Sequence, residues 1–355
     1  MIHVWNICHH CGMSPIVGPC FRCETCPLGP DIDLCSRCYQ GFQEGRVPHP
    51  TESAALAELA ERPHVFVRGE GVPREACEPW LHIRCPETAP PPVLRGFLVR
   101  PEFRYGRQSS FGGYGFIARH GEHVILLTAL HVMDEIMKRL HIDTTDRNSR
   151  YTGEELPSLV ESVQLYDVLQ DRWMLHELGV AAPMLALPNA RTADEEPYAW
   201  RDIAAFRVSP QTSLNATPLA PEEPQIGDPV WLAGNMPDRT RTRRAVCVER
   251  TPNSFLFRYD EPKAMPAHSS GAPILDRNGQ VVGINTGLGK FAGHDMGHAN
   301  PLTSIRAHLA EALFVYPKPR GPAMRGRASS TAIPSASSSA SLPASPSSSR
   351  PTGSP

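Results

Sequence analysis

Three side chains in the second half of the sequence have the types and the order that serine-based hydrolysis needs. Ser270 lies in a run of small residues, 268–273, and small residues let a turn stay compact. His131 lies near the end of an apolar run, 124–132, that predicts a buried strand, and Asp202 precedes a second apolar segment. A serine hydroxyl needs an adjacent base, an imidazole can take its proton near neutral pH, and a buried carboxylate can orient that imidazole. The three residues therefore predict a catalytic triad.

Each of these residues also has a purely structural interpretation. A histidine in apolar surroundings is more often a core residue than a catalytic one, and Asp202 and Ser270 both fit ordinary turns. Asp134 is a second acid that could orient His131, although its place at the start of a predicted helix favours a surface role. Catalysis is favoured because the three residues occur together, in the order His, Asp, Ser that is found in chymotrypsin.

Five short segments resemble those of trypsin-like serine proteases and occur in the same order. They are residues 113–118, 128–132, 202–204, 227–234 and 270–273. In addition, Asn278 and Gly279 lie between apolar runs and predict a β-hairpin directly after the serine turn. The resemblance covers about residues 95–315. It implies a mainly β fold of two packed antiparallel β-barrels, with His131, Asp202 and Ser270 as the triad between them.

The resemblance also implies an oxyanion hole, formed by backbone N–H groups of Ser270 and His268. The family usually has glycine at the second of these positions, and a Cβ there disfavours positive φ. One lost donor can cost about 2.7–4 kcal/mol of transition-state stabilisation. The sequence is therefore compatible with an active enzyme, with one that needs a partner, and with an inactive protease fold.

Three positions correspond to the family's primary substrate pocket, and none of them is charged. They are Ala264, Thr286 and Gly287. The resemblance therefore favours an uncharged substrate residue in this pocket over lysine or arginine. His298 is a nearby residue that could alter this preference.

The amino-terminal region carries a second chemically distinctive pattern. Seven of the ten cysteines lie between positions 8 and 38 and form four CxxC spacings, two of which share Cys23. Two CxxC pairs can complete a tetrahedral zinc site, whereas a disulfide framework is the alternative in a secreted chain. Residues 1–5 are followed by polar residues and cysteines rather than by an apolar run, which is not typical of a secretory signal. Zinc is therefore favoured.

Residues 5–66 resemble a ZZ-type zinc finger, a family that binds two structural zinc ions in a crossed arrangement. The matching segments are 15–26, 33–39 and 64–66. The resemblance implies two ligand sets, which are Cys8, Cys11, Cys35 and Cys38 for one ion and Cys23, Cys26, His49 and His64 for the other. Cys20 stands where the family has arginine and is expected to be a spare thiol, although it also forms a CxxC pair with Cys23. Residues 54–60 predict a short inserted helix before His64.

ZZ fingers bind protein segments, including peptide amino termini, and acidic side chains usually contact the terminal amine. Glu24, Asp31 and Asp33 are the candidates here, with ordinary solvated surface as an equal alternative. The resemblances together favour a recruitment arrangement, in which the finger holds a protein and the protease domain cuts it or a neighbour.

The remaining segments predict a linker, an excursion within the protease domain, a closing helix and a tail. Residues 67–94 are a Pro-containing linker, and residues 133–200 form a long, partly helical excursion between histidine and aspartate. Residues 301–313 predict a helix with Ile305, Leu309 and Leu313 on one face. Residues 316–355 are rich in Ser, Pro and Ala, which predicts disorder.

Charge and hydropathy exclude other function classes. The formal net charge of −2 argues against general nucleic-acid binding, and the basic run at 239–244 predicts a solvated hairpin loop. No apolar segment is long enough to cross a membrane. The sequence therefore predicts a cytoplasmic trypsin-like serine endopeptidase that acts on protein or peptide substrates and binds a protein partner through its finger. The alternative is an inactive protease-fold adaptor.

Overall fold

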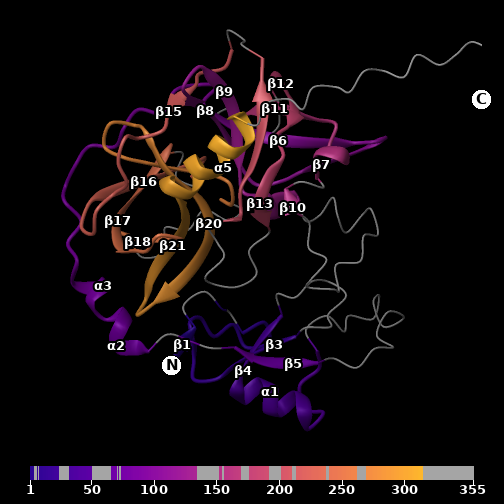
Figure 1. Cartoon of the computed structure of the whole chain (residues 1–355). Helices are drawn as coiled ribbons and strands as arrows, with labels where there is room; N and C mark the ends of the chain where they lie inside the picture. The colour runs from indigo at the N-terminus through magenta and orange to yellow at the C-terminus, as the bar shows by residue number, and fades with distance from the viewer. Residues whose placement is uncertain are drawn as a thin grey trace, which may run out of the picture. The chain divides into compact units, whose positions relative to one another are not determined.

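The computed structural model describes residues 1–3, 6, 8–23, 32–49, 65–69, 71, 73–133, 152–153, 156–168, 176–191, 201–209, 213–236, 240–261 and 269–314 (Figure 1). The predicted inserted helix at 54–60 and the predicted tail at 316–355 lie outside the described residues. The fold is mainly β, as predicted.

Six antiparallel strands close the first β-barrel. In order around the barrel they are β6 (Leu98–Tyr105), β8 (Gly115–His120), β9 (His123–Thr128), β14 (Ala204–Val208), β12 (Glu177–Met184) and β11 (Ser162–Asp167). The barrel closes because β6 pairs with β11 on one side and with β8 on the other. Two edge strands extend the sheet, β7 (Gln108–Phe111) and β15 (Thr217–Pro218).

Six further strands close the second barrel, in the order β16, β17, β18, β21, β20 and β19. Their bounds are β16 (Pro229–Ala233), β17 (Thr242–Arg250), β18 (Phe255–Tyr259), β19 (Pro273–Leu275), β20 (Val281–Phe291) and β21 (His294–Pro301). The predicted hairpin after the serine turn is confirmed, because β19 pairs with β20. Asp276 stabilises the connecting loop by accepting hydrogen bonds from the backbone N–H groups of Asn278 and Gln280.

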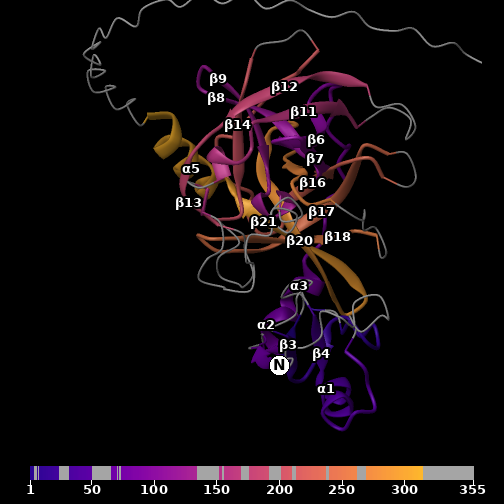
Figure 2. The same ribbon diagram turned by 90° about the vertical axis from the view of Figure 1, so that its right-hand side faces the viewer.

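One hydrophobic cluster extends through both barrels, and its buried side chains include Phe116, Phe206 and Trp231. The closing helix α5 (Leu302–Phe314) packs on this cluster (Figures 1 and 2). Its predicted apolar face is confirmed, because Ile305 and Leu309 are fully buried and Leu313 packs against the core. The two predicted barrels are therefore present and share a continuous core.

Two segments contain strands that the sequence did not predict. The described part of the 133–200 excursion consists mainly of strands, with a 3-10 turn at Leu156–Ser158, and residues 134–151 lie outside the described residues. Strands β11 and β12 belong to the first barrel, and β10 (Thr152–Gly153) pairs with β13 (Leu187–Arg191). The basic run at 239–244 continues from the hairpin loop into a strand, because β17 begins at Thr242. Arg244 forms an ion pair with Asp260 beyond the end of the neighbouring strand β18.

The amino-terminal region is built from short elements. A three-stranded sheet has the order β4 (Asp33–Cys35), β3 (Cys20–Cys23) and β5 (Phe66–Gly69), and helix α1 (Ser36–Gln43) follows β4 directly. A two-stranded sheet joins β1 (Ile2–His3) to β2 (Ile16–Val17). The linker contains α2 (Arg74–Cys77) and α3 (Pro79–His82). None of the helices in the described ranges is long and apolar enough to cross a membrane.

Candidate active site and metal centre

His131 and Asp202 form a closely hydrogen-bonded pair. The imidazole Nδ1 lies 2.5 Å from Asp202 Oδ2, and the His131 backbone N–H donates to Oδ1 over 2.9 Å. Asp202 is 1 % exposed, whereas the side chain of His131 is 27 % exposed. An ionised carboxylate only accepts hydrogen bonds, so Nδ1 carries the proton and Nε2 is left as the basic nitrogen. Asp202 therefore fixes both the backbone and the tautomer of His131.

The ends of two neighbouring strands position this pair. Ala204 in β14 pairs with Thr128 in β9, so the residues just before β14 lie beside those just after β9. His131 was expected at the end of the strand; β9 ends at Thr128, and His131 lies just beyond it in a 3-10 turn, Leu130–Met133. The change of backbone direction is stabilised by Asp202, which accepts the N–H that a continued strand would have donated to a neighbour.

Ser270 lies in a tight turn of the second barrel. Gly271, the next residue, has φ +80°, a conformation that glycine adopts at little cost. Its N–H donates to the backbone oxygen of Asn285 in β20 over 2.8 Å, and the carbonyl of Ser270 accepts from the N–H of Tyr114 in the first barrel over 2.8 Å. The turn is therefore bonded to both barrels.

Two glycines allow the serine turn to approach the histidine. A Cβ on Gly113 would lie 2.3 Å from the Ser270 carbonyl oxygen and 2.7 Å from Cγ1 of Val132, the residue after His131. A Cβ on Gly271 would lie 2.1 Å from the Tyr114 carbonyl oxygen. The Ser270 carbonyl and Val132, the residue after His131, therefore both lie next to Gly113.

Several predicted site residues lie outside the described residues. They are Asp134, Ala264 and His268 in the protease region and Glu24, Cys26, Asp31 and His64 in the finger. Of the predicted oxyanion donors, only Ser270 is therefore described, and its backbone N–H has no hydrogen-bond acceptor among the described residues.

The two described pocket positions lie beside His298. The Thr286 hydroxyl is 3.0 Å from His298 Nδ1, and Gly287 pairs with His298 across β20 and β21. Burial lowers the pKa of His298 to about 4, despite an opposing effect of Asp202. His298 is therefore neutral at physiological pH, and neither described position places a charge in the predicted pocket.

Two buried asparagines contact the site and were given no role in the sequence interpretation. The side-chain amide of Asn285 donates to the carbonyl and the hydroxyl of Ser269, each over 3.0 Å. The amide of Asn300 donates to the backbone oxygen of Asp202 over 3.4 Å. Both are less than 2 % exposed. Neither role could be recognised from the sequence, because each depends on which backbone groups the fold places beside the amide.

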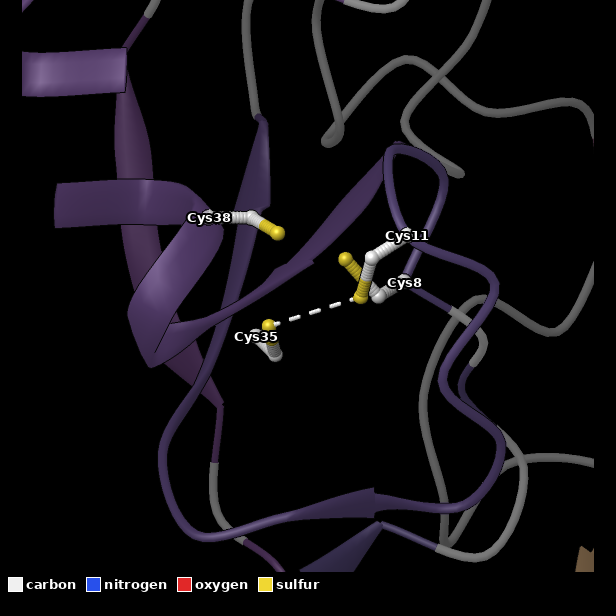
Figure 3. Close-up of side chains that lie close together, drawn as sticks. All are labelled: Cys8, Cys11, Cys35 and Cys38. Carbon is white, nitrogen blue, oxygen red and sulfur yellow. Dashed lines mark hydrogen bonds between the residues drawn. The ribbon is translucent and has the colours of Figure 1, made fainter. Parts of the chain in front are cut away.

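Four cysteines of the finger gather around one point (Figure 3). They are the predicted first ligand set, Cys8, Cys11, Cys35 and Cys38, and their sulfur atoms all lie within 4.8 Å of one another. The first two come from the turn after residue 8, and the last two from the junction of β4 and α1. Two CxxC turns thus face each other across the cluster.

The geometry of this cluster fits a structural zinc ion. Tetrahedral zinc with bonds to sulfur of about 2.3 Å places the sulfur atoms about 3.8 Å apart, and the sulfurs of Cys11 and Cys35 are 3.9 Å apart. Burial raises the pKa of the Cys8 thiol, but hydrogen bonds from the backbone of Cys11 and Cys35 outweigh this effect and bring that pKa down to about 7. A thiolate is the form that binds zinc.

Cys20 lies outside the four-cysteine cluster. It is buried next to Asp33, and burial raises the pKa of its thiol to about 12, with a further contribution from that carboxylate. Its place outside the cluster agrees with the first predicted ligand set, which does not include it. Asp33 itself is 5 % exposed and accepts hydrogen bonds from Asn6 and Arg22. Its carboxylate is therefore already engaged, which argues against Asp33 as a receptor for a peptide amine.

Comparison with known families identifies both regions. Residues 113–284 match the model of the trypsin-like peptidase domain, and residues 2–47 match that of the ZZ-type zinc finger. The magnetosome formation protease MamE of Paramagnetospirillum magneticum is 31% identical over 124 residues, which cover 31% of this chain and 16% of that protein. The chain therefore matches less than a fifth of the length of this relative.

Solved structures with similarity to the chain include bacterial proteases. The HtrA-type protease AlgW aligns with a TM-score of 0.38 and 15% identity, over 62% of this chain and 60% of that one. The Rv3671c protease from M. tuberculosis aligns with a TM-score of 0.37 and 17% identity, over 61% and 81%. The two family matches agree with the His131–Asp202 pair and with the four-cysteine cluster. The chain thus carries a trypsin-like peptidase domain behind an amino-terminal ZZ-type zinc finger.

Proposed function

We propose that this protein is a serine endopeptidase whose zinc finger binds a protein partner or substrate. The observation that carries the proposal is the His131–Asp202 pair, with its 2.5 Å hydrogen bond, beside the Ser270 turn. Ser270 attacks the scissile carbonyl carbon while His131 Nε2 takes its proton. His131 then returns that proton to the leaving amine, and water releases the acyl group from Ser270 by the same route. Asp202 stabilises the imidazolium that forms in each step.

The oxyanion of each tetrahedral intermediate would be stabilised by backbone N–H groups. The Ser270 N–H has no acceptor among the described residues, which supports its role as one donor. The N–H of His268 is proposed as the other. Because His298 is neutral at physiological pH, the pocket beside Thr286 and Gly287 would prefer an uncharged substrate residue.

A reducing compartment suits the cysteine chemistry, and we place the protein in the cytoplasm on this ground. Among the described residues, Cys20, Cys85 and Cys247 are free thiols, and Cys247 is fully buried. Disulfides form and persist in oxidising compartments, whereas cysteine-based zinc sites suit reducing ones.

The finger is proposed to hold a second structural zinc ion through Cys23, Cys26, His49 and His64. Two of these residues are described, and both are buried. Cys23 pairs with Phe66 across β3 and β5, and the His49 ring lies 5.8 Å from the Phe66 ring. This common neighbour supports a shared site. When bound, zinc would link β3 to the segment that carries His49 and replace the core that so small a domain lacks.

Cleavage of a denatured protein substrate tests the proposed activity. The wild-type chain should cleave it, and Ser270→Ala should lose cleavage while keeping its fold and zinc. Ser109→Ala is the matched control, because Ser109 is exposed on β7 and hydrogen-bonds to Glu102 away from the site. Absence of cleavage by a folded, zinc-loaded wild type, with and without candidate partners, would favour the inactive adaptor instead.

A further inference from the structure

Asn285 makes four hydrogen bonds to the turn that carries the nucleophile. Its backbone oxygen accepts from Gly271 N–H, and its backbone N–H donates to Ala272 O, each over 2.8 Å. Its side-chain amide donates to the carbonyl and to the hydroxyl of Ser269, each over 3.0 Å. Asn285 therefore contacts the residues on both sides of Ser270.

The side-chain contact bears directly on the proposed oxyanion donor. The carbonyl of Ser269 and the N–H of Ser270 belong to one planar trans peptide unit, in which the two groups point in opposite directions. The Ser269 carbonyl accepts from the Asn285 amide and also from Ala272 N–H, over 3.0 Å. Fixing this carbonyl therefore fixes the direction of the Ser270 N–H, which has no acceptor among the described residues.

The next peptide unit is fixed as well. The Ser270 carbonyl accepts from Tyr114 N–H, and the Gly271 N–H of the same unit donates to Asn285 O. Both peptide units that flank Ser270 are thus held, and Asn285 contributes to each. All the groups involved are uncharged.

The choice of residue points to function rather than stability. Asn285 is 1 % exposed, and its Oδ1 is buried without a hydrogen-bond partner among the described residues. A buried acceptor of this kind is unfavourable, and such groups are often found where a site needs them. A leucine of similar size would avoid that cost, but it could donate nothing to Ser269.

We propose that Asn285 is a positioning residue that orients the Ser270 N–H as an oxyanion donor. This inference rests on the proposed function. Asn285 acts through the Ser269 carbonyl and touches neither substrate nor the Ser270 hydroxyl. The hydrogen bonds between Asn285 and the serine turn join neutral groups, so no charged partner is needed to hold the turn in this conformation. Ser269 fits this arrangement because its hydroxyl accepts the second N–H of the amide.

The first test compares Asn285→Leu with Gln164→Leu. Gln164 is a matched control because it is buried in the first barrel, where its amide donates to Gly179 O over 2.9 Å. Asn285→Leu should lower kcat about 100-fold, with little change in KM, and should slow fluorophosphonate labelling in parallel. Gln164→Leu should keep kcat close to the wild-type value. Equal loss of kcat in both variants, or none in Asn285→Leu, would overturn the proposal.

A second variant keeps the test valid if leucine disturbs the fold. A protonated aspartic acid can donate one hydrogen bond to the Ser269 carbonyl, whereas an ionised one cannot. The kcat of Asn285→Asp, divided by that of the wild type at the same pH, should therefore rise as pH falls from about 8 to about 5. The division removes pH effects that both proteins share. A ratio that does not change with pH would count against the proposal.

Hydrogen exchange separates this inference from the proposed function. In wild type the N–H groups of Gly271 and Ala272 are hydrogen-bonded and should be protected. Protection of Gly271 and Ala272 should fall in Asn285→Leu and not in Gln164→Leu, whether or not the protein cleaves anything. If the wild type is inactive but shows this exchange pattern, the proposed function is refuted and the positioning role of Asn285 is retained. Unchanged protection in Asn285→Leu would refute the positioning role.

Discussion

At the scale of single residues, the described site combines a buried carboxyl group with a partly exposed imidazole. Asp202 is buried and takes two hydrogen bonds from His131, so its carboxylate is compensated by the group that it orients. The imidazole remains accessible to solvent and to the neighbouring serine turn. This asymmetry is what a general base needs, because the orienting acid keeps its charge while the base gains and loses a proton.

Replacing Asp202 by asparagine should nearly abolish activity without unfolding the protein. The amide would donate to Nδ1, place the imidazole proton on Nε2 and remove the basic nitrogen from the serine. By analogy with the trypsin triad, kcat should fall by about 10⁴. Asp167→Asn is the control, since Asp167 is also buried but forms an ion pair with Arg95 in the first barrel. Equal activity of the two variants would contradict the assignment of Asp202.

His298 predicts a pH dependence of stability. Its pKa is about 4 in the folded protein and about 6.5 when unfolded, because burial disfavours the imidazolium. The folded state therefore binds fewer protons than the unfolded state between these values. The stabilisation is complete above pH 6.5 and is lost as pH falls through 4, by up to about 3 kcal/mol. Denaturant unfolding of wild type and His298→Gln should show the difference, and parallel pH profiles would contradict it.

At the scale of elements, the site depends on a close approach between two turns that belong to different barrels. Gly271 allows this approach in two ways. It adopts a positive φ, and it has no Cβ, which would otherwise clash with the Tyr114 carbonyl oxygen. Tyr114 in turn accepts a hydrogen bond from the Thr128 hydroxyl at the end of β9. The strand that leads to His131 and the turn that carries Ser270 are therefore linked through Tyr114.

Gly271 and Gly279 form a natural pair for testing this contact. Both have φ near +80°, but a Cβ on Gly279 would approach no atom closer than 3.5 Å. Gly279→Ala should cost about 1 kcal/mol of unfolding free energy from backbone strain alone and keep activity. Gly271→Ala should cost at least about 3 kcal/mol and abolish activity, because backbone must move. Similar costs for the two variants, measured by denaturant unfolding, would show that the close approach is unimportant.

The sequence predicted those parts of the fold whose signals are local. The apolar run before His131, the Asn278-Gly279 turn and the face of α5 formed by Ile305 and Leu309 each depend on short-range patterns, and each is confirmed. Strands β11 and β12 were missed, because their pairing depends on distant partners in β6 and β14 rather than on their own periodicity.

The candidate site was predictable to the same extent. His131, Asp202 and the four clustered cysteines carry chemistry in their side chains and could be recognised from type and spacing. Asn285 could not, since its role depends on which backbone groups β20 places beside the serine turn. Asp33 showed the opposite failure, because an acidic residue that looked available is held by Asn6 and Arg22 in the folded finger.

At the scale of the whole molecule, the chain joins a domain with a large hydrophobic core to one that depends on metal. The protease domain buries a continuous cluster through both barrels, whereas the finger's own buried cluster consists mostly of cysteines. Three of those, Cys8, Cys35 and Cys38, belong to the four-cysteine cluster proposed to bind zinc. Loss of zinc should therefore unfold the finger and leave the barrels folded.

Zinc content tests the ligand assignments of the finger. The intact chain, prepared anaerobically, should hold two zinc ions per molecule. Cys35→Ser should lose one ion, because it removes a member of the four-cysteine cluster, while Cys20→Ser should keep both. Metal analysis of the three proteins by mass spectrometry would decide this. A single ion in the intact chain would refute the second site, and loss of metal in Cys20→Ser would refute its role as a spare thiol.

The most direct test of the central claim is labelling of Ser270 by a fluorophosphonate, which reacts only with a serine that a neighbouring base has activated. The intact, zinc-loaded protein should take up one label per molecule, and peptide mapping should locate it on Ser270. Labelling should disappear in His131→Ala and persist in Ser109→Ala, because only the former removes the base. A label on another residue, or equal labelling with and without His131, would contradict the claim that Ser270, His131 and Asp202 act together.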